Sequence, residues 1–217
     1  MSDQNKPPFR IREDYVYHAF ISYKRGDLLH GWLRTHFYKE LKSRLTDVMG
    51  EEAKIFVDYD VEVGLVPSNA LLECLYHSRC LVSICGDAYF RSPWCSVEWR
   101  TFEARDLSNG DINLSKDGKN YTLKRIFPIR WQDCIANPLV SGPNGRVCYD
   151  FREYRHSHES WSKHETYIDF QKDVDCLAER ISALVDGIEP LSAVGSWVNP
   201  LYCPLLNTTP EEFPFKL

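Results

Sequence analysis

The sequence has no long hydrophobic run. Nowhere in its 217 residues do apolar residues approach the stretch of about eighteen that a membrane-spanning helix needs. It has no basic run of the kind that binds phosphate backbones, and its net charge of −5 argues against nucleic-acid binding. The polar start, MSDQNKPPFRIRED, lacks the apolar segment of a secretory signal. These absences predict a cytoplasmic protein with no membrane span and no nucleic-acid partner.

The eight cysteines include no Cys-x-x-Cys pair, and most lie in apolar runs such as CLVSIC at 80–85. Without a secretory signal, this pattern indicates reduced thiols in the core rather than a disulfide framework. The histidines cluster once, in HSHESWSKH at 156–164, and their spacing there fits no zinc pattern. We therefore expect a solvated loop at 156–164 and no metal site.

What the sequence does contain is an alternation of short apolar runs with amphipathic stretches. The apolar runs predict strands at 15–23, 53–59, 80–86, 123–131 and 146–151. Apolar residues that recur every three or four positions predict helices at about 27–49, 68–78, 92–106 and 168–186. Polar, turn-rich segments predict surface loops at 106–122 and 137–145.

Capping residues support two of these helices. Asp27 is the predicted N-cap of the first helix, and Gly50 is its predicted stop. In the third helix, Ser92 is the predicted N-cap and Pro93 occupies the first helical position, which is a favoured pairing.

Strands that alternate with helices form βαβ units and predict a mostly parallel sheet covered on both faces. Five strands in this pattern indicate an α/β, flavodoxin-like, doubly wound fold of strand order 2-1-3-4-5. Ligands of such folds bind outside the carboxyl ends of the strands, at the switch between the first and third strands. The loop after Tyr23, the loop at 58–67 and the start of the helix at 92 should therefore surround one crevice.

The domain organisation follows from the same pattern. We expect a flexible leader at 1–14 and a single domain at 15–187. Residues 188–217 are rich in proline and aromatic residues and have no clear period, so they should pack on the domain as a tail.

Two stretches resemble the Toll/interleukin-1 receptor (TIR) domain family. HAFISYKRGD at 18–27 is similar to the first strand and following loop of these domains. IFVDYDVEVGLVPSNALLECLYHSRCLVSICGDAYFRSPWCSVEW at 55–99 resembles their second strand, BB loop, second helix, third strand and third helix. The resemblance covers about 15–187 and implies the flavodoxin-like fold.

TIR domains include adaptor modules that assemble receptor complexes and enzymes that cleave NAD+. The enzymatic members carry a glutamate in the third helix, often in a Trp-x-x-x-Glu pattern, and Trp94 to Glu98 matches it. The resemblance thus implies that Glu98 is the catalytic carboxylate and that Trp94 shapes the pocket. The same pattern also occurs in TIR domains that only scaffold.

Three further positions are implied by the resemblance as substrate-binding residues. Arg25 would bind a phosphate of NAD+, Tyr23 would stack on a ring, and Asp58 matches an acidic residue at the same place in the family. The residues themselves leave structural roles open. Tyr23 can cap the core, Arg25 can be a solvated charge, and Asp58 can cap a turn.

The chemistry of NAD+ cleavage suits one glutamate. Trp94 and Glu98 are four residues apart and share one helix face. Breaking the nicotinamide–ribose bond develops an oxocarbenium-like ribose, which a carboxylate beneath the ring stabilises. Nicotinamide is a good leaving group, so neither a general acid, a metal nor a second cofactor is required, and NAD+ is the substrate.

The resemblance further implies a stand-alone prokaryotic protein of Thoeris-like anti-phage defence. Its product would be ADP-ribose or a cyclic ADP-ribose isomer that signals to a separate effector. The alternative is a non-catalytic module that scaffolds or mimics TIR–TIR signalling. Gly64, Leu65 and Val66 belong to an apolar loop that either folds back on its own domain or forms a contact surface. The resemblance implies the second, with head-to-tail self-assembly with other TIR protomers.

Overall fold

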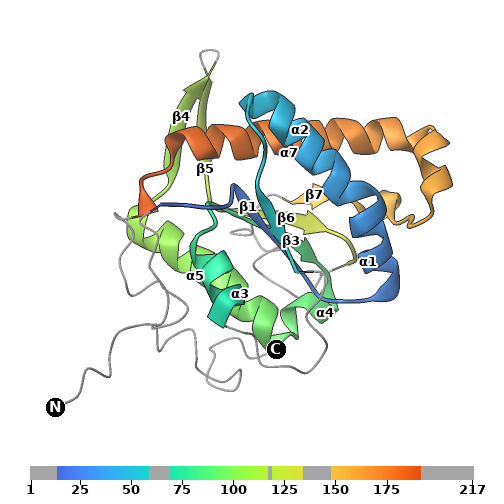
Figure 1. The fold of residues 1–217 in the computed structure, drawn as a ribbon, viewed down its shortest axis with the longest axis horizontal. Coiled ribbons are helices and arrows are strands. Elements are labelled where there is room, and N and C mark those ends of the chain that lie inside the picture. Colours follow the sequence, from blue (N-terminus) through green and yellow to red (C-terminus); the bar gives the residue numbers. More distant parts are fainter. Residues whose placement is uncertain (1–13, 59–68, 117–118, 134–147, 192–217) are drawn as a thin grey trace.

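Five short strands form one parallel sheet at the centre of the molecule (Figure 1). The computed structural model describes residues 14–58, 69–116, 119–133 and 148–191. The strands of the sheet, in chain order, are β1 (Ala19–Tyr23), β2 (Ile55–Val57), β3 (Leu81–Cys85), β6 (Ile126–Arg130) and β7 (Tyr149–Asp150). Their spatial order is β2-β1-β3-β6-β7, so the predicted flavodoxin-like order 2-1-3-4-5 is confirmed.

Helices cover both faces of this sheet (Figure 1). On one face lie α1 (Asp27–Trp32), the π-helical turn η1 (Leu33–Phe37), α2 (Tyr38–Met49) and α7 (Thr166–Gly187). On the other lie α3 (Asn69–Tyr76), α4 (Asp87–Phe90) and α5 (Pro93–Asn109). The short helices η2 (Arg152–Tyr154) and η3 (Glu159–Lys163) connect β7 to α7.

Residues of β1 alternate between the two cores. Ala19 and Ile21 pack into the cluster that faces α2 and α7, whereas Phe20 packs with residues of α3 and α5. This alternation is the period-two geometry of a strand. It assigns Ser22, two residues after Phe20, to the α5 side of the sheet.

Three local expectations are wrong. Residues 106–122 do not form a loop: α5 continues to Asn109, and an antiparallel hairpin of β4 (Ile112–Lys116) and β5 (Lys119–Leu123) follows. The sequence has an Asp-Gly pair between these strands, which favours a hairpin turn. The polar residues around this pair led instead to the prediction of a loop. The N-cap of α1 is Gly26, with Asp27 already in the first turn.

The third correction concerns 156–164. Its histidines are exposed, but Trp161 is buried in η3 against Phe170 and Tyr167 of α7, so the segment is not simply a solvated loop. Burying an indole ring removes a large apolar area from water, which favours a packed segment even where the neighbouring residues are polar.

Helix ends agree better with the sequence. Gly50 ends α2 in the left-handed region at φ 70°, where glycine is favoured because it has no Cβ. Ser92 is the N-cap of α5 and Pro93 its first residue, as predicted. Among the described helices, none combines the length and the apolarity that crossing a membrane demands.

A buried arginine ties the segment after α7 to the body of the domain. The Arg125 guanidinium contacts Asp106 at 3.3 Å and Glu189 at 2.8 Å. Leu191 is buried close by, packed against Tyr15 and Tyr76. These contacts attach the first residues of the predicted tail, and the rest of that tail lies outside the described residues.

We expect the docking of α7 to depend on its inner face. Replacing Ile181, which is fully buried, by alanine leaves a cavity and should reduce the free energy of unfolding by about 2–5 kcal/mol. The matched control is Ile168→Ala on the same helix, where the side chain is 58% exposed and the loss should stay within about 0.5 kcal/mol. Urea unfolding measures both values, and equal losses would show that α7 is not packed as described.

Candidate functional site

Glu98 lies in the second turn of α5 with its carboxyl group buried, at 4% exposure, near the carboxyl end of β1. Cys95, Glu98 and Phe102 recur at intervals of three and four, so all three lie on the inward face of the helix. Trp94, four residues before Glu98, is half-buried. The sequence expectation that these two residues share one face is therefore confirmed.

The capping of α5 sets where this face begins. The Ser92 hydroxyl accepts a long hydrogen bond of 3.5 Å from the Cys95 amide, and Pro93 fixes the first helical residue. Because the helix begins at Pro93, Glu98 in its second turn lies at the edge of the sheet where β1 and β3 end.

A chain of hydroxyl groups leads to the Glu98 carboxyl group. Ser22, on β1, donates a hydrogen bond to Glu98 Oε2. The Ser22 oxygen also lies 2.7 Å from the hydroxyl of Tyr89 in α4. When Glu98 is ionised it can only accept, so Ser22 gives it its only proton and the proton in the second bond comes from Tyr89. The site thus joins β1, α4 and α5.

The environment favours the neutral form of Glu98. Burial raises its pKa to about 8, and the nearby negative charge of Asp58 acts in the same direction. The hydrogen bonds from Ser22 and from the Trp94 side chain act the other way and lower this pKa. The balance leaves a carboxyl group whose proton is lost only slightly above neutral pH.

The other predicted site residues also follow strands at this edge of the sheet, but they differ in how they interact with Glu98. Asp58 follows β2 and acts electrostatically on Glu98. The Tyr23 hydroxyl donates to the Asp58 carbonyl oxygen at 2.9 Å and lies 3.2 Å from Nδ1 of His30. Arg25 is half-buried in the loop after β1 and is not among the groups that shift the pKa of Glu98.

Lys24, the neighbour of Arg25, was not among the predicted site residues, but it acts on a side chain next to Glu98. Its positive charge acts on the thiol of Cys95, three residues before Glu98. The predicted assembly residues Gly64, Leu65 and Val66 lie outside the described residues.

Sequence reasoning missed Ser22 and Tyr89. Ser22 stands inside the quoted FISY motif, and its distance of two residues from Phe20 could have placed it on the α5 side of the sheet. Tyr89 left no comparable signal, because only the turn between β3 and α5 brings its hydroxyl to Ser22.

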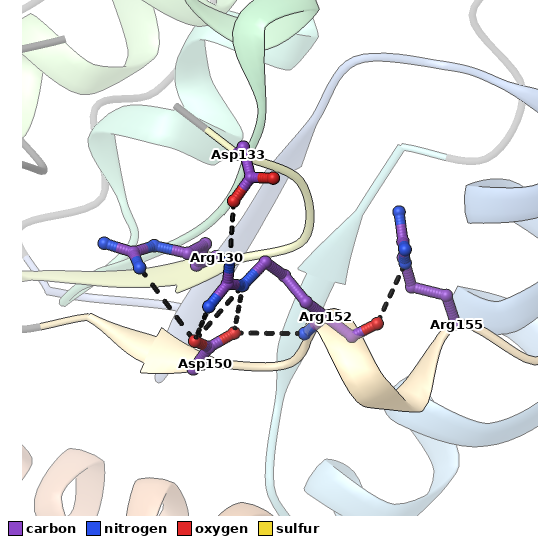
Figure 2. A network of polar contacts seen from close by, with 5 residues as sticks. All are labelled: Arg130, Asp133, Asp150, Arg152 and Arg155. Carbon is purple, nitrogen blue, oxygen red and sulfur yellow. Dashed lines mark hydrogen bonds and ion pairs between the residues drawn. The ribbon is translucent and has the colours of Figure 1, made fainter. Parts of the chain in front are cut away.

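A second polar cluster lies at the carboxyl ends of β6 and β7 (Figure 2). The Arg152 guanidinium is held between Asp150, at 2.6 Å, and Asp133, while Arg130 is 3.9 Å from Asp150. Arg155 donates to the Arg152 carbonyl oxygen at 2.9 Å. The Arg152 guanidinium is thus bonded to two carboxylates. These bonds hold η2 against β7 and against the segment that follows β6.

No group of three or more histidine, cysteine, aspartate or glutamate side chains in the described ranges is arranged to hold a metal ion. The exposed His158 and His164 bond to neighbouring serine and threonine hydroxyls instead.

Comparison with known proteins gives one family match and a similar solved structure. Residues 16–113 match the family model of the TIR domain, a stretch that includes Ser22, Asp58, Trp94 and Glu98. This part of the chain is therefore similar to a TIR domain. Among solved structures, it is similar to the TIR domain of the Toll-related receptor TRR-2 from Hydra magnipapillata. That match has 14% identity and a TM-score of 0.41, and it covers 73% of this chain and 98% of the other. No curated protein matches the chain.

The buried acid Glu98 should make the stability of the protein depend on pH. The pKa of Glu98 is raised from 4.5 to about 8, so the stability associated with its neutral form is present below pH 4.5 and is lost as pH rises through 8. Glu98→Gln does not titrate and avoids this loss. Its advantage in unfolding free energy over wild type should therefore grow with pH in this window, by up to about 1.4 kcal/mol per pH unit.

Urea unfolding of both proteins at several pH values checks this expectation. A difference between wild type and Glu98→Gln that stays constant from pH 4.5 to about 8 would show that the carboxyl group is not buried as described.

Proposed function

We propose that the protein is an NAD+ nucleosidase that cleaves the nicotinamide–ribose bond, with Glu98 as its catalytic carboxylate. The observation that carries this proposal is that Glu98 is buried without a counter-ion among the described residues, at the carboxyl ends of the strands, where ligands of such folds bind. Among the described residues, its hydrogen-bond partners are the neutral side chains of Ser22 and Trp94, and the charge that acts on it is the like charge of Asp58.

Buried charges with a structural role in this molecule look different. Asp106 and Arg125 form an ion pair, and the guanidinium of Arg105 donates to the carbonyl oxygens of Ser78 and Tyr76 at 2.8 Å each. Burying an acid without a cation costs free energy, and sites with such perturbed acids are candidates for catalysis. Glu98 is thus better explained by chemistry than by stability.

The proposed reaction needs little else. The bond between ribose C1′ and the pyridinium nitrogen breaks, and its electron pair neutralises the departing nicotinamide. The developing positive charge on the ribose is stabilised by ionised Glu98. C1′ then gains the oxygen of a water, which loses a proton, to give ADP-ribose. Attack by a nucleophilic atom of the same ADP-ribose would give a cyclic isomer instead.

The neighbouring residues would hold the substrate. In this proposal Trp94 shapes the pocket above Glu98, Tyr23 presents a ring at the end of β1, and Asp58 borders the same crevice. Arg25 binds a phosphate, since its guanidinium can contact two oxygens at once. Arg152 is a poorer candidate because Asp150 and Asp133 already occupy its donors.

The proposed biological role is signalling in anti-phage defence by a Thoeris-like prokaryotic protein of the cytoplasm. The product would activate a separate effector, and activity would require assembly with other TIR protomers. A non-catalytic scaffold is the second candidate, because Glu98 is shielded from solvent in this conformation. Assay of free nicotinamide after incubation with NAD+ separates the two functions, and chromatography identifies the product.

Replacing Glu98 by glutamine should leave the fold intact and reduce NAD+ cleavage by about a hundred- to a thousandfold or more, because only the stabilising charge is lost. Release of nicotinamide measures the rate. The matched control is Glu103→Gln on the same helix, which should keep wild-type activity. A Glu98→Gln protein that cleaves NAD+ as fast as wild type would contradict the catalytic assignment.

Activity should depend on assembly through the 58–68 loop. We expect specific activity to fall on dilution, and we expect Leu65→Asp to abolish activity because a charge would oppose an apolar contact between protomers. The control is Leu107→Asp, where the leucine is 81% exposed on α5. Constant specific activity on dilution, together with a fully active Leu65→Asp, would leave assembly without support.

A further inference from the structure

The chain Tyr89–Ser22–Glu98 has a direction. With Glu98 ionised, Ser22 donates to its carboxylate, and Tyr89 supplies the proton that the Ser22 oxygen accepts. Both hydroxyl-bearing side chains are essentially inaccessible to solvent, with 1% exposure each. Both bonds are therefore made out of contact with solvent, and together with the hydrogen bond from Trp94 they orient the carboxyl group.

We propose that Ser22 is a positioning residue for Glu98, held in turn by Tyr89, and that this hydroxyl chain fixes the carboxyl group and favours its ionised form. Hydrogen bonds in such chains polarise one another, and a bond to a charged acceptor is stronger than one between neutral groups. The role of the chain in NAD+ cleavage rests on the proposed function, whereas its action on the carboxyl group does not.

The groups that face Glu98 come from four elements. Ser22 belongs to β1, Tyr89 to α4, and Trp94 and Cys95 to the first turn of α5, while Asp58 follows β2. Of these, the hydrogen bond from Ser22 is the strongest influence that opposes the effect of burial. Its loss should shift the ionisation of Glu98 toward higher pH.

The experiment follows the Glu98 carboxyl carbon by NMR in protein labelled with 13C-glutamate. The resonance is assigned by its absence from Glu98→Gln. In Ser22→Ala the pKa of Glu98 should rise by about one unit relative to wild type, the amount expected for a lost hydrogen bond to a charged group. In Tyr89→Phe it should rise by less, because Ser22 remains but loses the bond that orients it.

A matched control stands on the next strand. Ser83 of β3 pairs in register with Ser22 and is equally buried, but its hydroxyl contacts the Cys85 thiol rather than Glu98. Ser83→Ala should leave the Glu98 titration unchanged. Asp58→Asn provides a test of sign, since removing its negative charge should lower the pKa of Glu98.

The double variant Ser22→Ala/Tyr89→Phe covers the case in which Ser22→Ala alone does not fold. It removes both hydroxyls, so no buried donor is left without an acceptor. It should raise the Glu98 pKa as Ser22→Ala does. An unchanged titration in either of these variants would overturn the proposal.

Kinetics provide the second readout. The acid limb of the kcat/KM profile for NAD+ cleavage, which reports the free enzyme, should move upward in Ser22→Ala by the same amount as the NMR titration, so that kcat/KM near neutral pH falls about tenfold. KM should change little, because Ser22 lies beneath Glu98 and does not contact substrate. A changed KM with an unmoved acid limb would contradict a positioning role.

The two proposals fail in different ways. If wild type releases no nicotinamide but the Glu98 titration responds to Ser22→Ala, the nucleosidase function is wrong and the positioning of the carboxyl group stands. If wild type cleaves NAD+ and neither titration nor acid limb responds, Ser22 is only a packed core residue.

Discussion

Parallel pairing of β1 with β2 on one side and with β3 on the other is the constraint on which the rest of the structure depends. A strand paired on both edges and covered on both faces has no surface for polar side chains along most of its length. Only at its carboxyl end, where the sheet stops, can a serine and a tyrosine follow the apolar run. The site lies at that end because polar groups are tolerated there.

This arrangement separates two kinds of buried charge. Arg125 is surrounded by Asp106, Glu189 and the Gly110 carbonyl, so its cost of desolvation is offset by direct bonds. Arg105 binds carbonyl oxygens at the end of α3 and just beyond it, where the negative end of the helix dipole favours a cation. Glu98 differs from both, since its hydrogen-bond donors among the described residues, Ser22 and Trp94, are neutral. Burial without a counter-ion raises the pKa of its carboxyl group to about 8.

The same burial bears on how the Glu98 carboxyl group can be reached. In the conformation described, the carboxyl group is enclosed by α4, α5 and the end of β1, so a substrate must displace something to reach it. The hydroxyl chain would keep the carboxyl group oriented while the covering elements move, since Ser22 lies in the most constrained strand of the sheet.

Much of this was predictable from sequence because it depends on periodicity and local chemistry. The apolar runs located all five strands of the sheet, the three- and four-residue spacing located α2 and α7, and Ser92 with Pro93 located the start of α5. The shared face of Trp94 and Glu98 follows from helix geometry alone. Polar composition misled where a short-range pattern competed with it, as in the β4–β5 hairpin and in η3, where Trp161 is buried.

What only the tertiary structure decided is which distant groups surround Glu98. Ser22 and Tyr89 are separated from it by 76 residues and by nine residues respectively, and their meeting depends on the register of β1 with β3 and on the turn into α5. The ionisation of a carboxyl group is set by the sum of burial, charges and hydrogen bonds around it. The sequence determined that an acid stands at this edge of the sheet, but its environment exists only once the strands have paired.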